Sequence, residues 1–269
     1  MQNLKTPTVL SIAGSDPSGG AGIQADLKTF MATGVYGAAV IAGLTAQNTV
    51  SVDAAEAVSA AFVEKQLQSV LDDLTIDAVK LGMLPNRENC EAIAPYLKNY
   101  TVVCDPVMVA TSGGQLVDRD GAAALIDCIL PQSDFVTPNR FELEVLYGKP
   151  VENPAAAGRA ILSQFPDMTG IVLKGGHITG TPDTVSDILL YRQGETISEV
   201  EEPHPRIATQ NTHGTGCTFS SALAAYLARG FAPADAFVRA VRLTHRLIEA
   251  AAKQKIGHGH GPLLHHSLI

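Results

Sequence analysis

The segment Asn211–Thr218 (NTHGTGCT) contains residue types suited to binding a phosphate group. An alanine-rich stretch follows it, so Gly214, Thr215 and Gly216 are expected to open a helix. Backbone N–H groups are free at a helix N-terminus, and the helix dipole adds about half a positive charge there. The pattern therefore predicts an anion site, although a glycine-rich helix cap without a ligand has the same pattern.

Cys217 lies in the first turn of this expected helix. The dipole at such a position can lower a thiol pKa from ~8.5 to ~3.5–7.5. Cys217 is therefore a candidate general base or nucleophile, with His213 four residues earlier as a candidate partner. The alternative is a small buried core residue, which is the usual environment of a free cysteine.

Two carboxylates and a lysine form a second candidate cluster. Asp105 interrupts the apolar run at 101–107, Glu142 lies three residues after Asn139 at a helix start, and Lys174 closes an apolar strand. If these strands are neighbours, both carboxylates reach one sheet edge, and Mg²⁺ favours one or two carboxylates together with phosphate oxygens. A lysine at the same edge can pair with a nucleotide phosphate. The alternatives are that Glu142 only caps its helix and that Lys174 is solvated.

An α/β fold is expected to position these residues, because apolar strands alternate with amphipathic helices. The expected strands are 8–14, 38–46, 77–83, 101–107, 134–139 and 170–176, with two short strands within 185–202. The expected helices are 21–33, 63–74, 88–97, 119–130, 139–147, 154–164, 215–228 and 233–253. This order predicts a mostly parallel central sheet flanked by helices, with a short antiparallel edge pair. No linker or repeat interrupts it, so residues 1–269 are predicted to form a single domain.

Polar residues recur where the expected strands end, and ligands of such folds bind at the carboxyl ends of the strands. The residues at these six ends are Ser15 with Asp16, Gln47 with Asn48, Gly82 with Met83, Asp105, Asn139 and Lys174. Loops are polar in general, but that rule explains one or two such ends more easily than six. The sequence therefore predicts a binding site along one edge of the sheet.

Composition excludes several classes of protein. The 269 residues carry 19 basic and 27 acidic side chains, a net charge of −8, without a Lys/Arg block, so neither nucleic acid nor an anionic membrane is an expected partner. Hydrophobic residues make up 46%, which is enough for a folded core. The four cysteines form no CxxC pair, residues 1–7 are polar, and no 18-residue apolar run occurs. A reduced, cytoplasmic environment is expected.

The C-terminal segment GHGHGP (257–262) and the pair His265–His266 have the composition of a transition-metal tract. The alternating glycines favour a tight, ordered loop instead. Both readings remain open from the sequence.

Taken in order, these motifs resemble the hydroxymethylpyrimidine/phosphomethylpyrimidine kinase family of the ribokinase-like superfamily. The resemblance is carried by IAGSDPSGGAGIQADLKTF (12–30), LTAQNT (44–49), DAVKLGML (77–84), DPVMVATSG (105–113), TPNRFE (137–142), VLKGGH (172–177), NTHGTGCT (211–218) and GHGHGPL (257–263). It implies a ribokinase-like three-layer fold. It also implies ATP-dependent phosphorylation of 4-amino-5-hydroxymethyl-2-methylpyrimidine and then of its monophosphate to the pyrophosphate, in thiamine biosynthesis.

The resemblance assigns residues to two sides of a site. On the substrate side it implies a ring-binding amide from Gln47, ring packing by Met83, and a closing loop that includes Gly14 and Asp26. On the other side it implies that ATP and its phosphates are bound by Asn139, Lys174, Thr212 and His213, and that Mg²⁺ is bound by Asp105 and Glu142. It implies an anion hole made by Gly214, Thr215 and Gly216, and a catalytic base, Cys217. Thr111 stands where many relatives carry lysine. A homodimer is the expected oligomer.

Three other functions fit parts of the pattern. A pyridoxal or pyridoxine kinase of vitamin B6 salvage would bind a similar planar hydroxymethyl compound. A Cys217/His213 hydrolase would need a third group that orients the histidine, and the sequence identifies none. A non-catalytic vitamin-binding module would not need Asp105, Glu142, Lys174 and Cys217 together.

Overall fold

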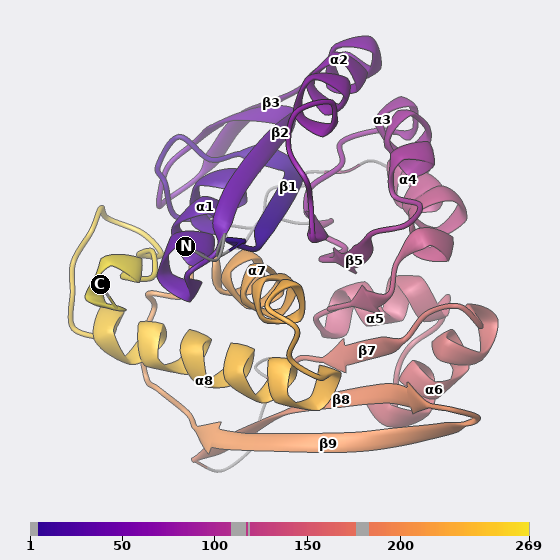
Figure 1. Cartoon of the computed structure of the whole chain (residues 1–269). Helices are drawn as coiled ribbons and strands as arrows, with labels where there is room; N and C mark the ends of the chain where they lie inside the picture. Colours follow the sequence, from indigo (N-terminus) through magenta and orange to yellow (C-terminus); the bar gives the residue numbers. More distant parts are fainter. Residues whose placement is uncertain (1–4, 109–116, 118, 176–182, 269) are drawn as a thin grey trace.

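A computed structural model describes residues 5–108, 117, 119–175 and 183–268 (Figure 1). Thr111 therefore lies outside the described residues. Within them, nine strands form one sheet in the order β3-β2-β1-β4-β5-β6-β7-β8-β9. The strands are β1 (Thr8–Ser15), β2 (Tyr36–Gln47), β3 (Val52–Ala57), β4 (Ala78–Leu81), β5 (Thr101–Cys104), β6 (Phe135–Val136), β7 (Gly170–Leu173), β8 (Thr184–Gln193) and β9 (Thr196–Pro205).

The middle of the sheet is parallel, and both edges are antiparallel. Strands β2, β1, β4, β5, β6 and β7 pair in parallel, whereas β3 pairs antiparallel with β2, and β7, β8 and β9 pair antiparallel in turn. The expected α/β fold with a mostly parallel sheet is confirmed.

Helices cover both faces of the sheet (Figure 1). They are α1 (Gly22–Thr33), α2 (Ala60–Leu71), α3 (Arg87–Ile93), α4 (Arg119–Ala124), α5 (Arg140–Tyr147), α6 (Pro154–Gln164), α7 (Thr215–Ala228) and α8 (Pro233–Ala251). Successive strand residues point to opposite faces. Val9 accordingly packs in a cluster with α1, α7 and α8, while Leu10 packs in a second cluster with α2, α3, α5 and α6.

The observed sheet differs from the expected one mainly in three places. The run at 101–107 ends as a strand at Cys104, because Pro106 has no N–H to donate to a sheet. The pair within 185–202 is longer than expected, with ten residues in each strand and a turn at Gly194, whose φ is +61°. Strand β3 was not predicted, since its sequence VDAAEA is exposed and has no apolar alternation.

The C-terminal segment forms an ordered loop against the turn between β2 and β3. Thr49 Oγ1 accepts hydrogen bonds from the N–H groups of His258 and Gly259, both at 3.2 Å, and the Thr49 carbonyl accepts one from His260 at 2.8 Å. The packing explains the glycines, because a side chain at Gly259 would overlap the Thr49 carbonyl. No helix in the described ranges is long and apolar enough to span a membrane.

Candidate functional site

One cavity of about 850 Å³ lies along the carboxyl ends of the parallel strands. The cavity is lined by residues of the strands β1, β2, β4, β8 and β9 and of the helices α1, α5, α7 and α8, together with the segments that follow β4, β5 and β7. Thirteen of the fourteen predicted site residues line this cavity. They are Gly14, Gln47, Met83, Asp105, Asn139, Glu142, Lys174, Thr212, His213, Gly214, Thr215, Gly216 and Cys217. The exception, Asp26, is described below.

The start of α7 is built by a close approach of two backbones. Gly214 has a φ of +80°, and a Cβ there would overlap the Gly20 carbonyl oxygen. Only glycine fits such a position, since its left-handed backbone and the contact both exclude a side chain. The loop before α1 is therefore in contact with the first turn of α7.

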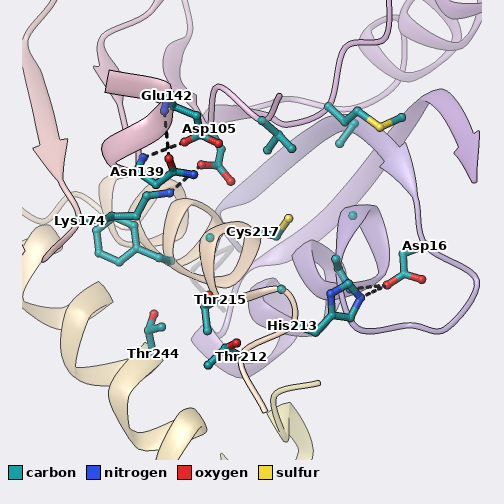
Figure 2. Close-up of a pocket in the computed structure, with 18 of the residues that line it drawn as sticks. Asp16, Asp105, Asn139, Glu142, Lys174, Thr212, His213, Thr215, Cys217 and Thr244 are labelled. Carbon is teal, nitrogen blue, oxygen red and sulfur yellow. Dashed lines mark hydrogen bonds and ion pairs between the residues drawn. The ribbon is translucent and has the colours of Figure 1, made fainter. Parts of the chain in front are cut away.

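The N-terminus of α7 faces the charged cluster that contains Asp105 and Lys174. A Cβ placed on Gly216 would lie 3.3 Å from Asp105 Oδ2 and 3.4 Å from Lys174 Nζ. Lys174 Nζ donates to Asp105 Oδ1 at 3.2 Å, and Thr137 Oγ1 donates to the same oxygen at 3.0 Å. The α7 N-terminus, one carboxylate and one ammonium group thus converge on the same part of the cavity (Figure 2).

Glu142 both caps its helix and faces the cavity. Asn139 Oδ1 accepts from the Glu142 N–H at 3.0 Å, and Glu142 Oε2 accepts from the Asn139 N–H at 2.8 Å, which is a capping box. Burial raises the pKa of Glu142 to about 7; Lys174 opposes this shift, and the negative charge of Asp105 adds to it. The helix-capping alternative is therefore observed, but it does not remove Glu142 from the site.

The two carboxylates suit a nucleotide-bound Mg²⁺. No group of three or more His, Cys, Asp or Glu side chains arranged to hold a metal occurs in the part of the chain that the structure describes. Mg²⁺ in nucleotide sites typically takes one or two carboxylates and completes its shell with phosphate oxygens and water. The donor set of Asp105 and Glu142 fits that pattern. Burial is the main cause of the raised pKa of Glu142, and the negative charge of Asp105, which a cation would offset, adds to it.

The other end of the cavity holds an amide and a thioether. Thr45 Oγ1 is 3.2 Å from Gln47 Oε1, which leaves the Gln47 NH₂ group as the available donor. A Cβ on Gly14 would lie 2.5 Å from Met83 Cε, so the glycine makes room for the methionine side chain. Gln47, Met83 and Gly14 are therefore brought together, as predicted.

Asp16 lies at this end of the cavity, although the sequence indicated it only as a polar residue at a strand end. Its carboxylate accepts hydrogen bonds from the N–H groups of Ser18, Gly20 and Ala21 at 2.8 to 3.1 Å, and it lies 2.7 Å from His213 Nε2. Burial raises the pKa of Asp16, but the His213 contact and these hydrogen bonds outweigh it, so that the pKa falls to about 2. His213 thus lies against Asp16, with Gln47 Nε2 3.5 Å away, rather than beside the charged cluster (Figure 2).

Asp26 lies behind the cavity wall, whereas it had been expected in the closing loop. Its side chain is fully buried and binds Lys80 Nζ, with both carboxylate oxygens at 2.9 Å. Ser11 and Ser221 also donate to it, at 2.6 and 2.7 Å. The sequence gives no signal for this ion pair, because Lys80 stands inside the otherwise apolar strand sequence AVKL.

Cys217 is partly buried, and its sulfur points into the cavity (Figure 2). Burial raises the pKa of the thiol to about 12, against an opposing effect from Lys80. The expectation of a lowered thiol pKa is therefore wrong, because burial outweighs the groups that lower it. Within the described ranges no hydrogen bond joins Cys217 to His213, so the Cys/His hydrolase lacks its required pair even though Asp16 orients the histidine.

Comparisons with known proteins agree with this geometry. Residues 16–264 match the phosphomethylpyrimidine kinase family. The chain is 46% identical over 264 residues to the hydroxymethylpyrimidine/phosphomethylpyrimidine kinase of Rhizobium meliloti (strain 1021), with 97% of each chain covered. It is 44% identical to the thiamine biosynthesis bifunctional protein ThiED of Geobacter sulfurreducens, covering 96% of this chain and 52% of that protein.

The fold is also close to that of a solved vitamin kinase. The structure of Bacillus subtilis pyridoxal kinase in complex with ADP superposes with a TM-score of 0.83 at 32% identity, over 98% of this chain and 99% of that one. Because the family match spans most of the sequence, the chain belongs to the phosphomethylpyrimidine kinase family of enzymes.

Proposed function

We propose that this chain uses ATP to phosphorylate 4-amino-5-hydroxymethyl-2-methylpyrimidine, and then its monophosphate, in thiamine biosynthesis. The observation that carries the proposal is the shared cavity, which Gln47 and Met83 line together with the α7 N-terminus and the charged side chains of Asp105, Glu142 and Lys174. A heteroaromatic alcohol and a nucleotide phosphate can therefore meet in one space. The names of the relatives support the same substrates.

Gln47 and Met83 would bind the pyrimidine. The NH₂ group of Gln47 suits a ring nitrogen as acceptor, because Thr45 lies against the amide oxygen. The Met83 thioether is suited to packing on an aromatic ring. The Asp16–His213 pair holds the neighbouring loop, so Gly14 and the following residues keep their place beside the substrate.

The phosphate end would work by positioning and charge stabilisation, because phosphoryl transfer leaves little covalent chemistry to the protein. The N–H groups of residues 214–217 would bind the oxygens of the transferred group, and losing one such donor typically costs ~10²–10³ in rate. Asp105 and Glu142 would hold Mg²⁺, which neutralises phosphate charge when bound. Lys174, Asn139 and Thr212 would contact the nucleotide, and Cys217 would accept the proton of the substrate alcohol.

The test is an ADP-release assay with Mg²⁺ and ATP. Hydroxymethylpyrimidine, its monophosphate, pyridoxal and adenosine are offered in parallel to the full chain. We expect turnover of both pyrimidines, with kcat/KM well above that for pyridoxal. No turnover of any of the four by folded protein would refute the kinase proposal.

Pyridoxal phosphorylation is the second candidate, and the similarity to the Bacillus subtilis enzyme favours it. The Cys217 sulfur faces the cavity, where a thiol can add to an aldehyde. Turnover of pyridoxal alone would move the function to vitamin B6 salvage. The two candidates share the phosphate end and differ in what Gln47 and Met83 select.

We further propose that residues 1–269 act as a single domain, as a homodimer, and in the cytoplasm. The continuous nine-stranded sheet supports the single domain. Four cysteines without a disulfide among the described residues fit a reducing compartment. Light scattering of the purified chain would test the dimer.

A further inference from the structure

Lys80 and Asp26 form an ion pair whose two side chains have no exposed surface. Asp26 lies in α1, Lys80 in β4, and the carboxylate also accepts hydrogen bonds from Ser11 of β1 and Ser221 of α7. Removing two charges from water costs several kcal/mol per ion, and apolar residues of similar volume often stabilise a core equally well. Such a pair beside a candidate active site therefore calls for a functional explanation.

The ion pair is attached to the first turns of α7. Ser221 lies one helical turn after Cys217, and its hydroxyl donates to Asp26 Oδ1 at 2.7 Å. Lys80 in β4 and Cys217 in α7 line the same cavity. The Lys80 side chain has no exposed surface, so it cannot contact a substrate itself and can act only through its neighbours.

Several charged groups face the Cys217 thiol. Burial raises the pKa of the thiol, and Lys80 is the strongest of the groups that lower it. Asp26 of α1 and Asp105 after β5 oppose Lys80, the backbone N–H of Gly22 supports it, and Lys174 after β7 also faces the sulfur. Burial lowers the pKa of Lys80, but Asp26, with smaller contributions from Cys217 and Asp105, raises it overall, so this ammonium stays charged.

We propose that Lys80, held in place by Asp26, is the internal counter-charge of Cys217 and controls how readily this sulfur exchanges its proton during phosphoryl transfer. The step runs in the fraction of the enzyme in which Cys217 is ionised: the substrate alcohol oxygen bonds to the γ-phosphorus, and its proton passes to the Cys217 thiolate. The bond from the γ-phosphorus to the bridging oxygen breaks, and ADP leaves with the electron pair. Lys80 and Asp26 are positioning residues here, and this inference rests on the proposed function for the identity of the alcohol and for Cys217 as the proton acceptor.

The test measures the reactivity of Cys217 without any substrate. Iodoacetamide alkylation is followed for each cysteine by peptide mass spectrometry between pH 8 and pH 10. For each unit by which the thiol pKa rises, the thiolate fraction falls tenfold while its nucleophilicity rises about threefold, so the rate falls roughly threefold. We expect Lys80→Met to slow Cys217 alkylation at least threefold at pH 8.5.

Asp26→Asn should also slow the alkylation of Cys217. It removes the carboxylate that keeps Lys80 charged, so burial favours the neutral amine and the thiolate loses its counter-charge. If the ion pair were merely structural, either variant would loosen the packing around Cys217, and its alkylation would become faster in both. Cys128, which lies outside the cavity, is the internal control and should react at the wild-type rate in both variants.

Alkylation of Cys217 in Lys80→Met at the wild-type rate or faster would overturn the proposal. If that variant does not fold, the pair Lys80→Met with Asp26→Leu replaces it, because no unpaired charge is then buried; it should also slow alkylation. In the kinase assay, Lys80→Met should lower kcat at least tenfold while the KM for the pyrimidine changes less than threefold. Absence of wild-type turnover would refute the proposed function, whereas the alkylation rates would still decide the role of Lys80.

Discussion

The sulfur of Cys217 is the group best placed to receive a proton from a substrate alcohol, because it points into the cavity at the start of α7. Cys217→Ala should lower kcat by ~10²–10⁴, the usual contribution of a general base, and leave KM within a few-fold of wild type. Steady-state kinetics of the ATP-dependent reaction measure both parameters. Cys128→Ala is the matched control, since Cys128 lies on a different element and does not line the cavity.

Cys217→Ser should be intermediate or worse, because an alcohol ionises less readily than a thiol. Full turnover in Cys217→Ala would show that the substrate proton leaves by another route. In that case the anion site at residues 214–217 would remain, since it depends on backbone N–H groups and not on the sulfur.

Individual residue types at the strand ends could be predicted from the sequence, but their pairing could not. Gln47, Met83 and Asp105 were found because each follows an apolar strand, and strand ends of this fold meet at one edge. The contact between Asp16 and His213 joins residues 197 positions apart, which no local pattern encodes. The effect of burial on Cys217 was missed for the same reason, because desolvation depends on elements that pack from elsewhere in the chain.

The start of α7 and the loop before α1 act as one structural unit. Gly214→Ala would force a side chain into the Gly20 carbonyl, in addition to the strain of a φ of +80°. We expect this variant to lose activity by at least ~10²-fold, since the backbone donors of the anion site would shift. It should also unfold at a clearly lower temperature in a calorimetric scan.

Gly230 is the matched control for this variant. It follows α7, has a φ of +83°, and has open space where a Cβ would lie. Gly230→Ala should therefore cost only the strain of the left-handed backbone, roughly 1–2 kcal/mol, and keep kcat unchanged. Equal loss of activity in both variants would mean that the Gly20 contact has no special role.

Most elements were predictable because their apolar residues repeat with a helical or strand period. Helices α5 and α6 agree with the expected ranges to within one residue, since the caps Asn139 and Asn153 begin them. Strand β3 escaped detection because it is an exposed edge strand, where no buried face imposes alternation. Its position is set by pairing with β2, which is a tertiary effect.

Across the whole molecule, the C-terminal segment connects the two ends of the site. The His213 N–H donates to the Gly261 carbonyl at 3.1 Å, and His265 Nε2 lies 3.0 Å from Thr218 Oγ1 of α7. The β2–β3 turn is held by the same segment through Thr49. The sequence predicted a tight loop here but not what it packs against, because its contacts are about 50 to 210 residues away in the chain.

This arrangement makes the stability of the molecule depend on His265. Burial, together with the nearby charge of Lys28, lowers the pKa of His265 from 6.5 to about 4. Between these values the unfolded chain binds a proton that the folded chain does not, so stability is complete above pH 6.5 and decreases as the pH falls towards 4. The shift corresponds to about 3 kcal/mol of unfolding free energy at most.

His265→Gln should therefore remove much of the acid sensitivity of the fold. Urea unfolding at pH 7.5 and at pH 4.5 gives the loss of unfolding free energy for each protein. That loss should be smaller in His265→Gln than in wild type by about 2 kcal/mol, because glutamine takes up no proton on unfolding. His258→Gln, which changes an exposed histidine that does not shift the pKa of His265, should keep the wild-type loss. Equal losses in all three proteins would mean that another group controls the acid response, and that the C-terminal segment does not couple protonation to the packing of α7.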